Sequence, residues 1–101
     1  MDREEVLSTL RQHAAELNAA GVISASLFGS LARGESDPGD VDIAVRLGED
    51  FSTGGFDYFW QRERLRENLS KLLGCKVDVV EEPVRKPGLQ QEIDRDRTLV
   101  F

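Results

Sequence analysis

The sequence has little with which to build sulfur or imidazole chemistry. It contains one cysteine, Cys75, and one histidine, His13. A single cysteine excludes an internal disulfide, and the pair cannot assemble a zinc site of nitrogen and sulfur ligands within one chain. No apolar run approaches the roughly 18 residues that cross a bilayer, and residues 1–5 do not resemble a signal peptide. We therefore expect a reduced, cytoplasmic protein that works with carboxylates, hydroxyls and backbone amides.

Positive charge is also in short supply. The 13 lysines and arginines are outnumbered by 19 acidic residues, so the net charge is −6. Such a chain is a poor general nucleic-acid binder, because phosphate binding needs a basic footprint, and it is a poor ligand for anionic membranes. With 101 residues, of which 40% are hydrophobic, the chain is expected to form a single domain over residues 1–101.

The hydrophobic pattern predicts helices and strands in alternation. Helices are expected over 3–19, 56–73 and 88–96, a short helical segment over 30–33, strands over 22–28, 40–47 and 75–80, and a last short strand over 98–101. His13 falls inside the first of these helices and is expected on its surface. Strands joined by helical crossovers predict an α+β (α/β two-layer) fold, with a short mixed β-sheet and helices packed on one face.

Three aspartates are expected on one surface of this sheet. Asp40 and Asp42 lie two residues apart on a predicted strand, so their carboxylates project from the same face. Asp78 lies between apolar residues on the third strand and repeats the pattern. If these strands are neighbours, the three carboxylates form a Mg²⁺ site, and a pair of metal ions is feasible. The alternative is that each aspartate simply lies on a solvated face.

A glycine and a serine follow the first predicted strand. Gly29 allows a positive φ and a close approach of a ligand to the backbone. Ser30 can cap the short helix, and the amides that follow it can bind an anion. By itself this pair is also what an ordinary helix cap contains. A phosphate cradle beside a metal site would indicate an enzyme that acts on nucleoside triphosphates.

Three segments together resemble the minimal nucleotidyltransferase (MNT) family of the DNA polymerase beta nucleotidyltransferase superfamily. They are Phe-Gly-Ser-Leu-Ala-Arg-Gly at 28–34, Asp-Val-Asp-Ile at 40–43 and Lys-Val-Asp-Val-Val at 76–80. The resemblance covers nearly the whole chain and implies the nucleotidyltransferase fold.

The resemblance also implies a role for each residue of these motifs. Gly29 and Ser30 would hold the β- and γ-phosphates of a nucleoside triphosphate. Asp40 and Asp42 would bind both Mg²⁺ ions. Asp78 would bind the ion that activates the incoming hydroxyl and would help to remove its proton. The hydroxyl would attack the α-phosphorus, and pyrophosphate would leave.

Two positions depart from the family pattern and one is ambiguous. Gly39 stands where the family usually has serine before the first aspartate, and the connecting turn is about one residue short. These departures leave the geometry of the turn open. Arg33 could bind the nucleotide's phosphates, or it could pair with Asp37 or Glu35 of the turn.

About twenty residues follow Asp78, too few for the helical acceptor domain that larger superfamily members carry. The acceptor would then come from a partner. The resemblance implies a HEPN-domain toxin, a small helical protein, with AMP transferred from ATP to one of its tyrosines, so that the chain acts as an antitoxin. One alternative is an MNT-fold binding module that neutralises its partner by contact. Another is a small-molecule nucleotidyltransferase.

Most of the aromatic residues are close together in the sequence. The cluster comprises Phe51, Phe56, Tyr58, Phe59 and Trp60. It could form a surface for a partner or for a homodimer, since aromatic side chains are favoured at interfaces, or it could complete the core. The charged residues of the helix that follows are expected on a solvated face, with contact to an acidic partner as the alternative.

Overall fold

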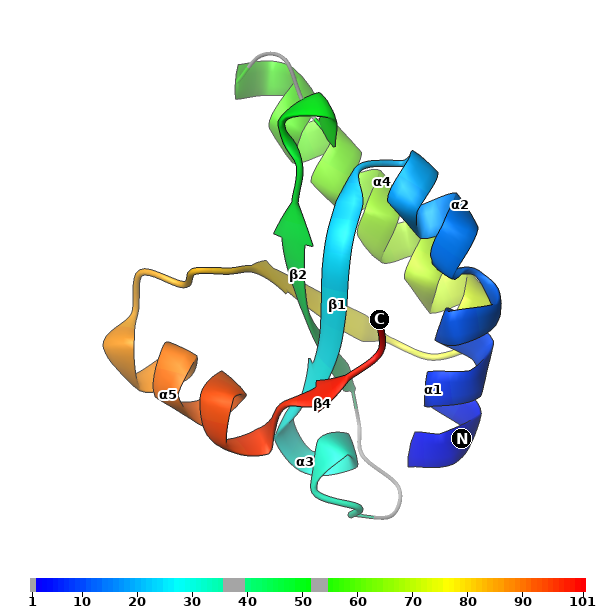
Figure 1. Ribbon diagram of the computed structural model, residues 1–101, viewed down its shortest axis with the longest axis vertical. Helices are drawn as coiled ribbons and strands as arrows, with labels where there is room; N and C mark the ends of the chain where they lie inside the picture. Colours follow the sequence, from blue (N-terminus) through cyan, green and yellow to red (C-terminus); the bar gives the residue numbers. More distant parts are fainter. Residues whose placement is uncertain (1, 36–39, 52–54) are drawn as a thin grey trace.

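The computed structural model describes residues 2–35, 40–51 and 55–101. Its elements, in chain order, are α1 (Arg3–Gln12), α2 (Ala14–Ala19), β1 (Val22–Phe28), α3 (Gly29–Ala32), β2 (Val41–Leu47), the 3₁₀ turn η1 (Glu49–Phe51), α4 (Gly55–Leu73), β3 (Val77–Glu81), α5 (Pro87–Asp96) and β4 (Thr98–Leu99). Figure 1 shows their arrangement. Apart from the division of the first helix, these bounds lie within two residues of the predicted ones.

The strands form one mixed sheet, as predicted. Their order is β3-β2-β1-β4. β1 is antiparallel to both of its neighbours, and β2 is parallel to β3. Parallel neighbours need a crossover connection, which α4 provides between β2 and β3. The carboxylate-bearing strands 40–47 and 75–80 of the prediction are therefore adjacent.

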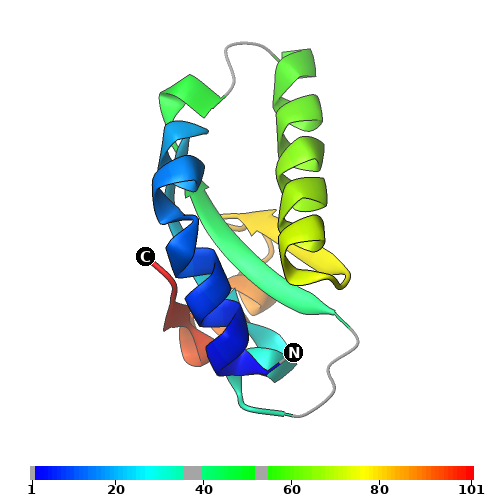
Figure 2. The ribbon, with the colours of Figure 1, turned by 90° about the vertical axis from the view of Figure 1, so that its right-hand side faces the viewer.

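One face of the sheet carries the main core. Figure 2 shows α1, α2 and α4 on this side. Alternate strand residues point into it, including Leu27, Ile43 and Val77, which are at most 1% exposed. Because the side chains of a strand alternate between faces, Asp42 and Asp78 point to the other side.

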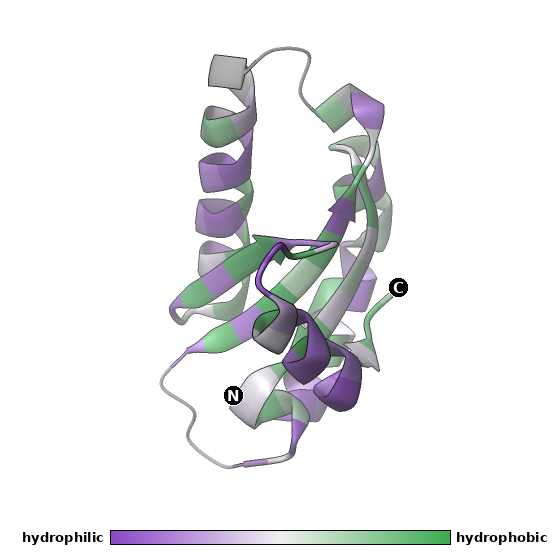
Figure 3. Ribbon diagram, turned by 90° about the vertical axis from the view of Figure 1, so that its left-hand side faces the viewer, coloured by the Kyte–Doolittle hydropathy of each residue, from purple (hydrophilic) through white to green (hydrophobic). Residues whose placement is uncertain are grey.

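The other face is partly covered as well. There α5 packs Ile93 against Phe28 and Ala44 in a second, smaller cluster, and Figure 3 shows α5 in front of the strands from this side. The prediction placed helices on one face only, so α5 adds a partial third layer. The aspartates lie on this face of the sheet, at the end of the strands where α3 begins.

The predicted helix over 3–19 is divided at His13. This residue leaves helical geometry with φ −105°, and its amide donates to the carbonyl of Leu10 at 3.1 Å. The imidazole is half-buried at the junction, with Nδ1 2.9 Å from the carbonyl oxygen of Thr9. In the described ranges, no helix combines the length and the apolar character that crossing a membrane requires.

Candidate active site

Two of the three predicted carboxylates are direct neighbours. Asp42 of β2 pairs in register with Asp78 of β3. The residues beside them in sequence, such as Val41 and Val77, are buried in the main core. The parallel pairing therefore places both acids side by side on the opposite face, as the strand pattern predicted.

Asp40 lies one residue before β2, at the same end of the sheet. One of its carboxylate oxygens is 3.8 Å from Nζ of Lys76, which precedes β3. Both side chains are substantially exposed, so this ion pair contributes little to stability. It does bias the Asp40 carboxylate toward the lysine.

The electrostatics of Asp42 reflect this crowding. Burial raises the pKa of the Asp42 carboxyl above its usual value, and the negative charges of Asp78, Asp40 and Glu92 raise it further, while Arg33 opposes them. Like charges held close together destabilise one another unless a cation is present. The neighbouring acids therefore concentrate negative charge around Asp42 and make its own ionisation less favourable.

Oxygen donors of this kind suit a hard divalent cation. As the side chains stand, however, no group of three or more histidines, cysteines or acids within residues 2–35, 40–51 and 55–101 is close enough together to hold a metal ion. The direction of Asp40 toward Lys76 is consistent with this. The donor chemistry fits Mg²⁺, and metal binding by Asp40, Asp42 and Asp78 stays a prediction.

The glycine-serine turn lies directly against Asp42. Phe28, the last residue of β1, pairs in register with Asp42, and Gly29 then turns the chain with φ +77° into α3. A Cβ atom on Gly29 would overlap Oδ2 of Asp42, so a larger residue would fit only if the Asp42 carboxylate moved. Ser30 follows as the second residue of α3. The two predicted halves of the site, Gly29-Ser30 and the aspartates, are thus in contact.

Arg33 lies at the C-terminal end of α3 and pairs with two acids. Its Nη1 donates to Oδ2 of Asp96 at 2.7 Å, and its Nη2 is 2.9 Å from Oε2 of Glu35. The predicted pairing with Glu35 is confirmed, whereas Asp37 and Gly39 lie outside the described residues. Phosphate binding by Arg33 stays a prediction.

Sequence reasoning did not single out two acids of α5 that face this site. Glu92 contributes negative charge at Asp42, and Asp96 binds Arg33. The available signal was their spacing, since residues four apart share one face of a helix. Buried Ile93 orients this helix on the sheet, which the sequence alone did not reveal.

The aromatic cluster divides between core and surface. Phe51 is buried and packs edge-on against Tyr58, whose hydroxyl donates to Glu81. Phe59 and Trp60 are 67% and 65% exposed. Because Phe59 and Trp60 are exposed, they are accessible to a partner protein. Phe51, in contrast, completes the core. The side chain of Phe56 lies outside the described residues.

Comparisons with known proteins agree with this geometry. The family described as "Nucleotidyltransferase domain" matches residues 7–99. The protein adenylyltransferase MntA of Thermococcus cleftensis is 37% identical over 95 residues, which cover 92% of this chain and 90% of the relative.

Solved structures share the fold. One described as a candidate minimal nucleotidyltransferase is 32% identical, with a TM-score of 0.73, over 97% of this chain and 95% of its own. A second, a tri-AMPylated Shewanella oneidensis HEPN toxin in complex with MNT antitoxin, matches at 20% identity and a TM-score of 0.64 over 94% of this chain and 71% of its own. With its fold, its paired aspartates and its glycine-serine turn, the chain belongs to the nucleotidyltransferase domain family and is a minimal nucleotidyltransferase.

Proposed function

We propose that the chain is a Mg²⁺-dependent protein adenylyltransferase that transfers AMP from ATP to a tyrosine hydroxyl of a HEPN-domain toxin, and so acts as its cytoplasmic antitoxin. The name of the Thermococcus cleftensis relative supports the activity. The Shewanella oneidensis complex, with its AMPylated toxin, supports the kind of partner.

The contact between Gly29 and Asp42 is the observation that carries this proposal. Any larger residue there would push the Asp42 carboxylate out of place, because its Cβ would overlap the carboxylate oxygen. A triphosphate held by Gly29 and Ser30 would therefore lie beside the acids that suit a metal ion. Nucleotidyl transfer needs this juxtaposition, because charge develops on the phosphates as the bond to the leaving group breaks.

In the proposed reaction, Asp40, Asp42 and Asp78 hold two Mg²⁺ ions, which when bound neutralise charge on the attacking and leaving oxygens. Gly29 and Ser30 bind the β- and γ-phosphates and orient the α-phosphorus toward the aspartates. The tyrosine oxygen bonds to this phosphorus, and the bond to the oxygen bridging to the β-phosphate breaks, so pyrophosphate leaves. Asp78, which is exposed, receives the hydroxyl proton. Arg33 adds positive charge for the triphosphate.

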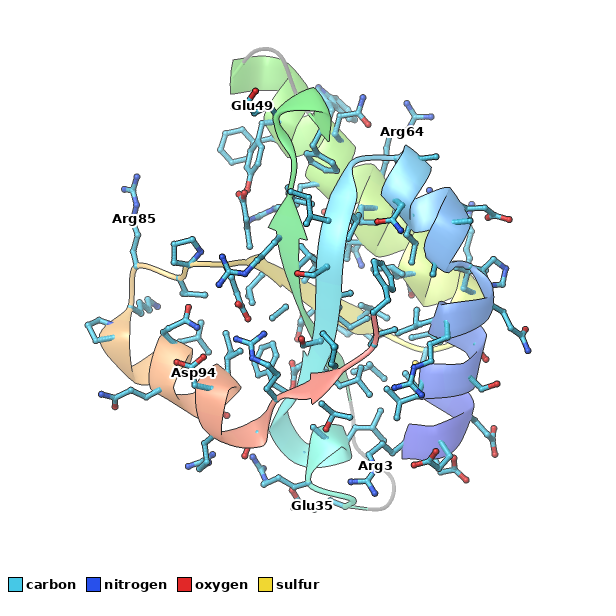
Figure 4. The ribbon with its side chains drawn as sticks, viewed as in Figure 1. Arg3, Glu35, Glu49, Arg64, Arg85 and Asp94 are labelled. Carbon is cyan, nitrogen blue, oxygen red and sulfur yellow. The ribbon has the colours of Figure 1, made fainter. Side chains whose placement is uncertain are left out.

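The test is to incubate the chain with labelled ATP, Mg²⁺ and a HEPN-domain partner encoded beside it, and then to weigh the partner by mass spectrometry. We expect a mass gain of one AMP or more. The double variant Asp40→Asn/Asp42→Asn should lose the transfer and keep the fold. Asp94→Asn, an exposed acid of α5 (Figure 4), is the matched control and should retain it. Transfer that survives in the double variant would reject the site.

The second candidate function is a catalytically weak binding module that neutralises its partner by contact. The exposure of Phe59 and Trp60 favours stable association, and Nζ of Lys76, 3.8 Å from the Asp40 carboxylate, would compete with a metal ion for that carboxylate. A stable complex in which the partner gains no mass would support this function. Labelling of small hydroxyl compounds without any partner would instead indicate a small-molecule nucleotidyltransferase.

A further inference from the structure

Asp96 is a buried acid that no part of the proposed reaction uses. It is the last residue of α5, and its side chain is only 3% exposed. Its carboxylate lies between two arginines: Nη1 of Arg33 is 2.7 Å from Oδ2, and Nε and Nη2 of Arg95 donate to the two oxygens at 3.0 and 3.2 Å. These arginines lower the pKa of the Asp96 carboxyl, so it is ionised at neutral pH.

The backbone on either side of Asp96 is firmly anchored. Three residues before it, Ile93 is fully buried against the sheet. One residue after it, Arg97 donates to Oγ of Ser26 at 3.1 Å and to the buried carboxylate of Glu82 at 2.9 Å. The backbone that carries Asp96 is thus tied to β1 and to the end of β3 through the side chain of the neighbouring Arg97.

Arg33 has much weaker support of its own. It follows a helix of four residues, and its side chain is 42% exposed. Its other partner is Glu35, two residues further along, which is 56% exposed and lies beyond α3 at the edge of the molecule in Figure 4. Without Asp96, pairing with Glu35 alone would leave the guanidinium free to move away from Asp42.

We infer that Asp96 is a positioning residue: it holds the guanidinium of Arg33 at the end of α3, the short helix whose first residue, Gly29, lies against Asp42, so that the guanidinium can bind the triphosphate. The inference rests on the proposed function, because it assumes that Arg33 faces a nucleotide. It assigns α5 a role in substrate binding, although no residue of α5 belongs to the family motifs at 28–34, 40–43 and 76–80. A charged partner fixed by packing pre-organises a binding group more strictly than an exposed partner does.

The test measures the Kd of a non-hydrolysable ATP analogue with Mg²⁺ by calorimetry. Asp96→Asn should weaken binding about tenfold, the loss expected for one misplaced charge-assisted contact. Asp96→Glu, which restores the charge, should recover most of the affinity. Asp94→Asn, on the same helix, should bind like the wild type. Thermal unfolding of each variant shows whether it is folded at the temperature of the titration.

The double variant Arg33→Gln/Asp96→Asn distinguishes positioning from other roles. If Asp96 acts through Arg33, the double variant should bind no more weakly than Arg33→Gln alone, because coupled residues are not additive. Additive losses would overturn the inference. Tighter binding by Asp96→Asn would also overturn it, because Asp96 would then compete with the triphosphate.

Two further results separate this inference from the proposed function. If Asp96→Asn does not fold, Arg33→Lys carries the test, since lysine keeps the charge but lacks the planar fork that pairs with both acids. Binding by Arg33→Lys equal to that of the wild type would then overturn the inference. Absence of nucleotide binding by the wild type would overturn the proposed function itself, whereas wild-type binding that Asp96→Asn leaves unchanged would overturn only the role of Asp96.

Discussion

Gly29 has a positive φ, which favours glycine, and it also lies against the carboxylate of Asp42. Mutations can separate the effects of these two features. Gly29→Ala would strain a residue at φ +77° and make its Cβ overlap Oδ2 of Asp42, which would have to move. We expect a loss of about 1–3 kcal/mol in the free energy of unfolding. Transfer should fall at least about a hundredfold, because displacing a reacting group by an ångström costs that much. Urea denaturation and the AMP-transfer assay measure the two effects.

Gly74 supplies the matched control for this change. It has φ +68°, and an added Cβ there would meet nothing within 4 Å. Gly74→Ala should therefore cost about 1 kcal/mol of stability and leave transfer unchanged. Equal loss of transfer in both variants would show that the contact with Asp42 does not matter.

Asp42 should weaken the fold at neutral pH. Its folded pKa is raised above the ordinary value of 3.8 by burial and then by Asp78 and Asp40, so the protonated form is favoured in the folded state. The resulting contribution to stability is present below the unfolded pKa and is lost as pH rises through the folded pKa. At neutral pH the charge of Asp42 therefore opposes folding.

Asp42→Asn should consequently raise Tm at pH 7 by roughly 2–4 °C without divalent metal, a gain of the size seen when a functional site is relieved of strain. The difference from the wild type should narrow toward about pH 3, where both carry an uncharged group. Addition of Mg²⁺ should raise the Tm of the wild type more than that of the variant, because a ligand of the folded state stabilises it. Thermal melts at both pH values test this, and a lower Tm for the variant at pH 7 would contradict it.

The sequence could predict the residues whose role follows from local patterns. Asp42 and Asp78 alternate with buried valine and isoleucine residues, so their common face followed from strand geometry alone. Gly29 stood where a strand gives way to a helix. For Asp96 the local pattern showed only that it shares a helix face with Glu92, because its partner Arg33 is 63 positions away in the chain and their pairing depends on how α5 packs.

At the level of elements, a buried ion pair fastens β3 to the C-terminal segment. The side chain of Glu82, next to the end of β3, is 1% exposed, and Nη2 of Arg97 lies 2.9 Å from its carboxylate, with Arg46 at 3.6 Å. Arg97→Leu would leave a buried charge with only its more distant partner. We expect a loss of about 2–3 kcal/mol, below the usual 3–5 for breaking a buried pair because Arg46 remains.

Urea denaturation measures this loss, and an exposed pair provides the control. Arg66 and Glu63 pair on the surface of α4, and such pairs contribute little. Arg66→Leu should change stability by no more than the error of the measurement. If Arg97→Leu also left the free energy of unfolding unchanged, the buried pair would not hold the C-terminal segment to the sheet.

The elements also show where sequence patterns reach their limit. Alternation along strand 40–47 placed Ala44 on the same face as the aspartates, and the structure confirms this. The alternation did not reveal that α5 covers Ala44. The helix at 88–96 is short and polar, and its sequence pattern does not indicate which surface of the sheet the helix covers. The break at His13 was missed for a related reason, since α1 and α2 share one continuous apolar stripe.

For the whole molecule, the charged face and the exposed aromatic residues lie apart. The aspartates are on the face that carries α5, whereas Phe59 and Trp60 project from α4, which packs on the other face. Figure 2 shows the first turns of α4 extending past the ends of the strands. A partner whose tyrosine reaches the aspartates would have to be large, or would have to wrap around the end of the sheet, to touch both.

The aromatic pair should contribute to binding the proposed helical partner. Phe59→Ala/Trp60→Ala should weaken the complex at least about tenfold, since exposed aromatic side chains at interfaces often dominate affinity, and should leave Tm within about 2 °C because neither ring is in the core. Leu99→Ala is the control, as Leu99 is 56% exposed on β4, the edge strand at the end of the sheet away from β3. Titration calorimetry with the partner measures affinity. If the double variant binds as tightly as Leu99→Ala, these residues form no part of the interface, and the partner must approach from the side of α5.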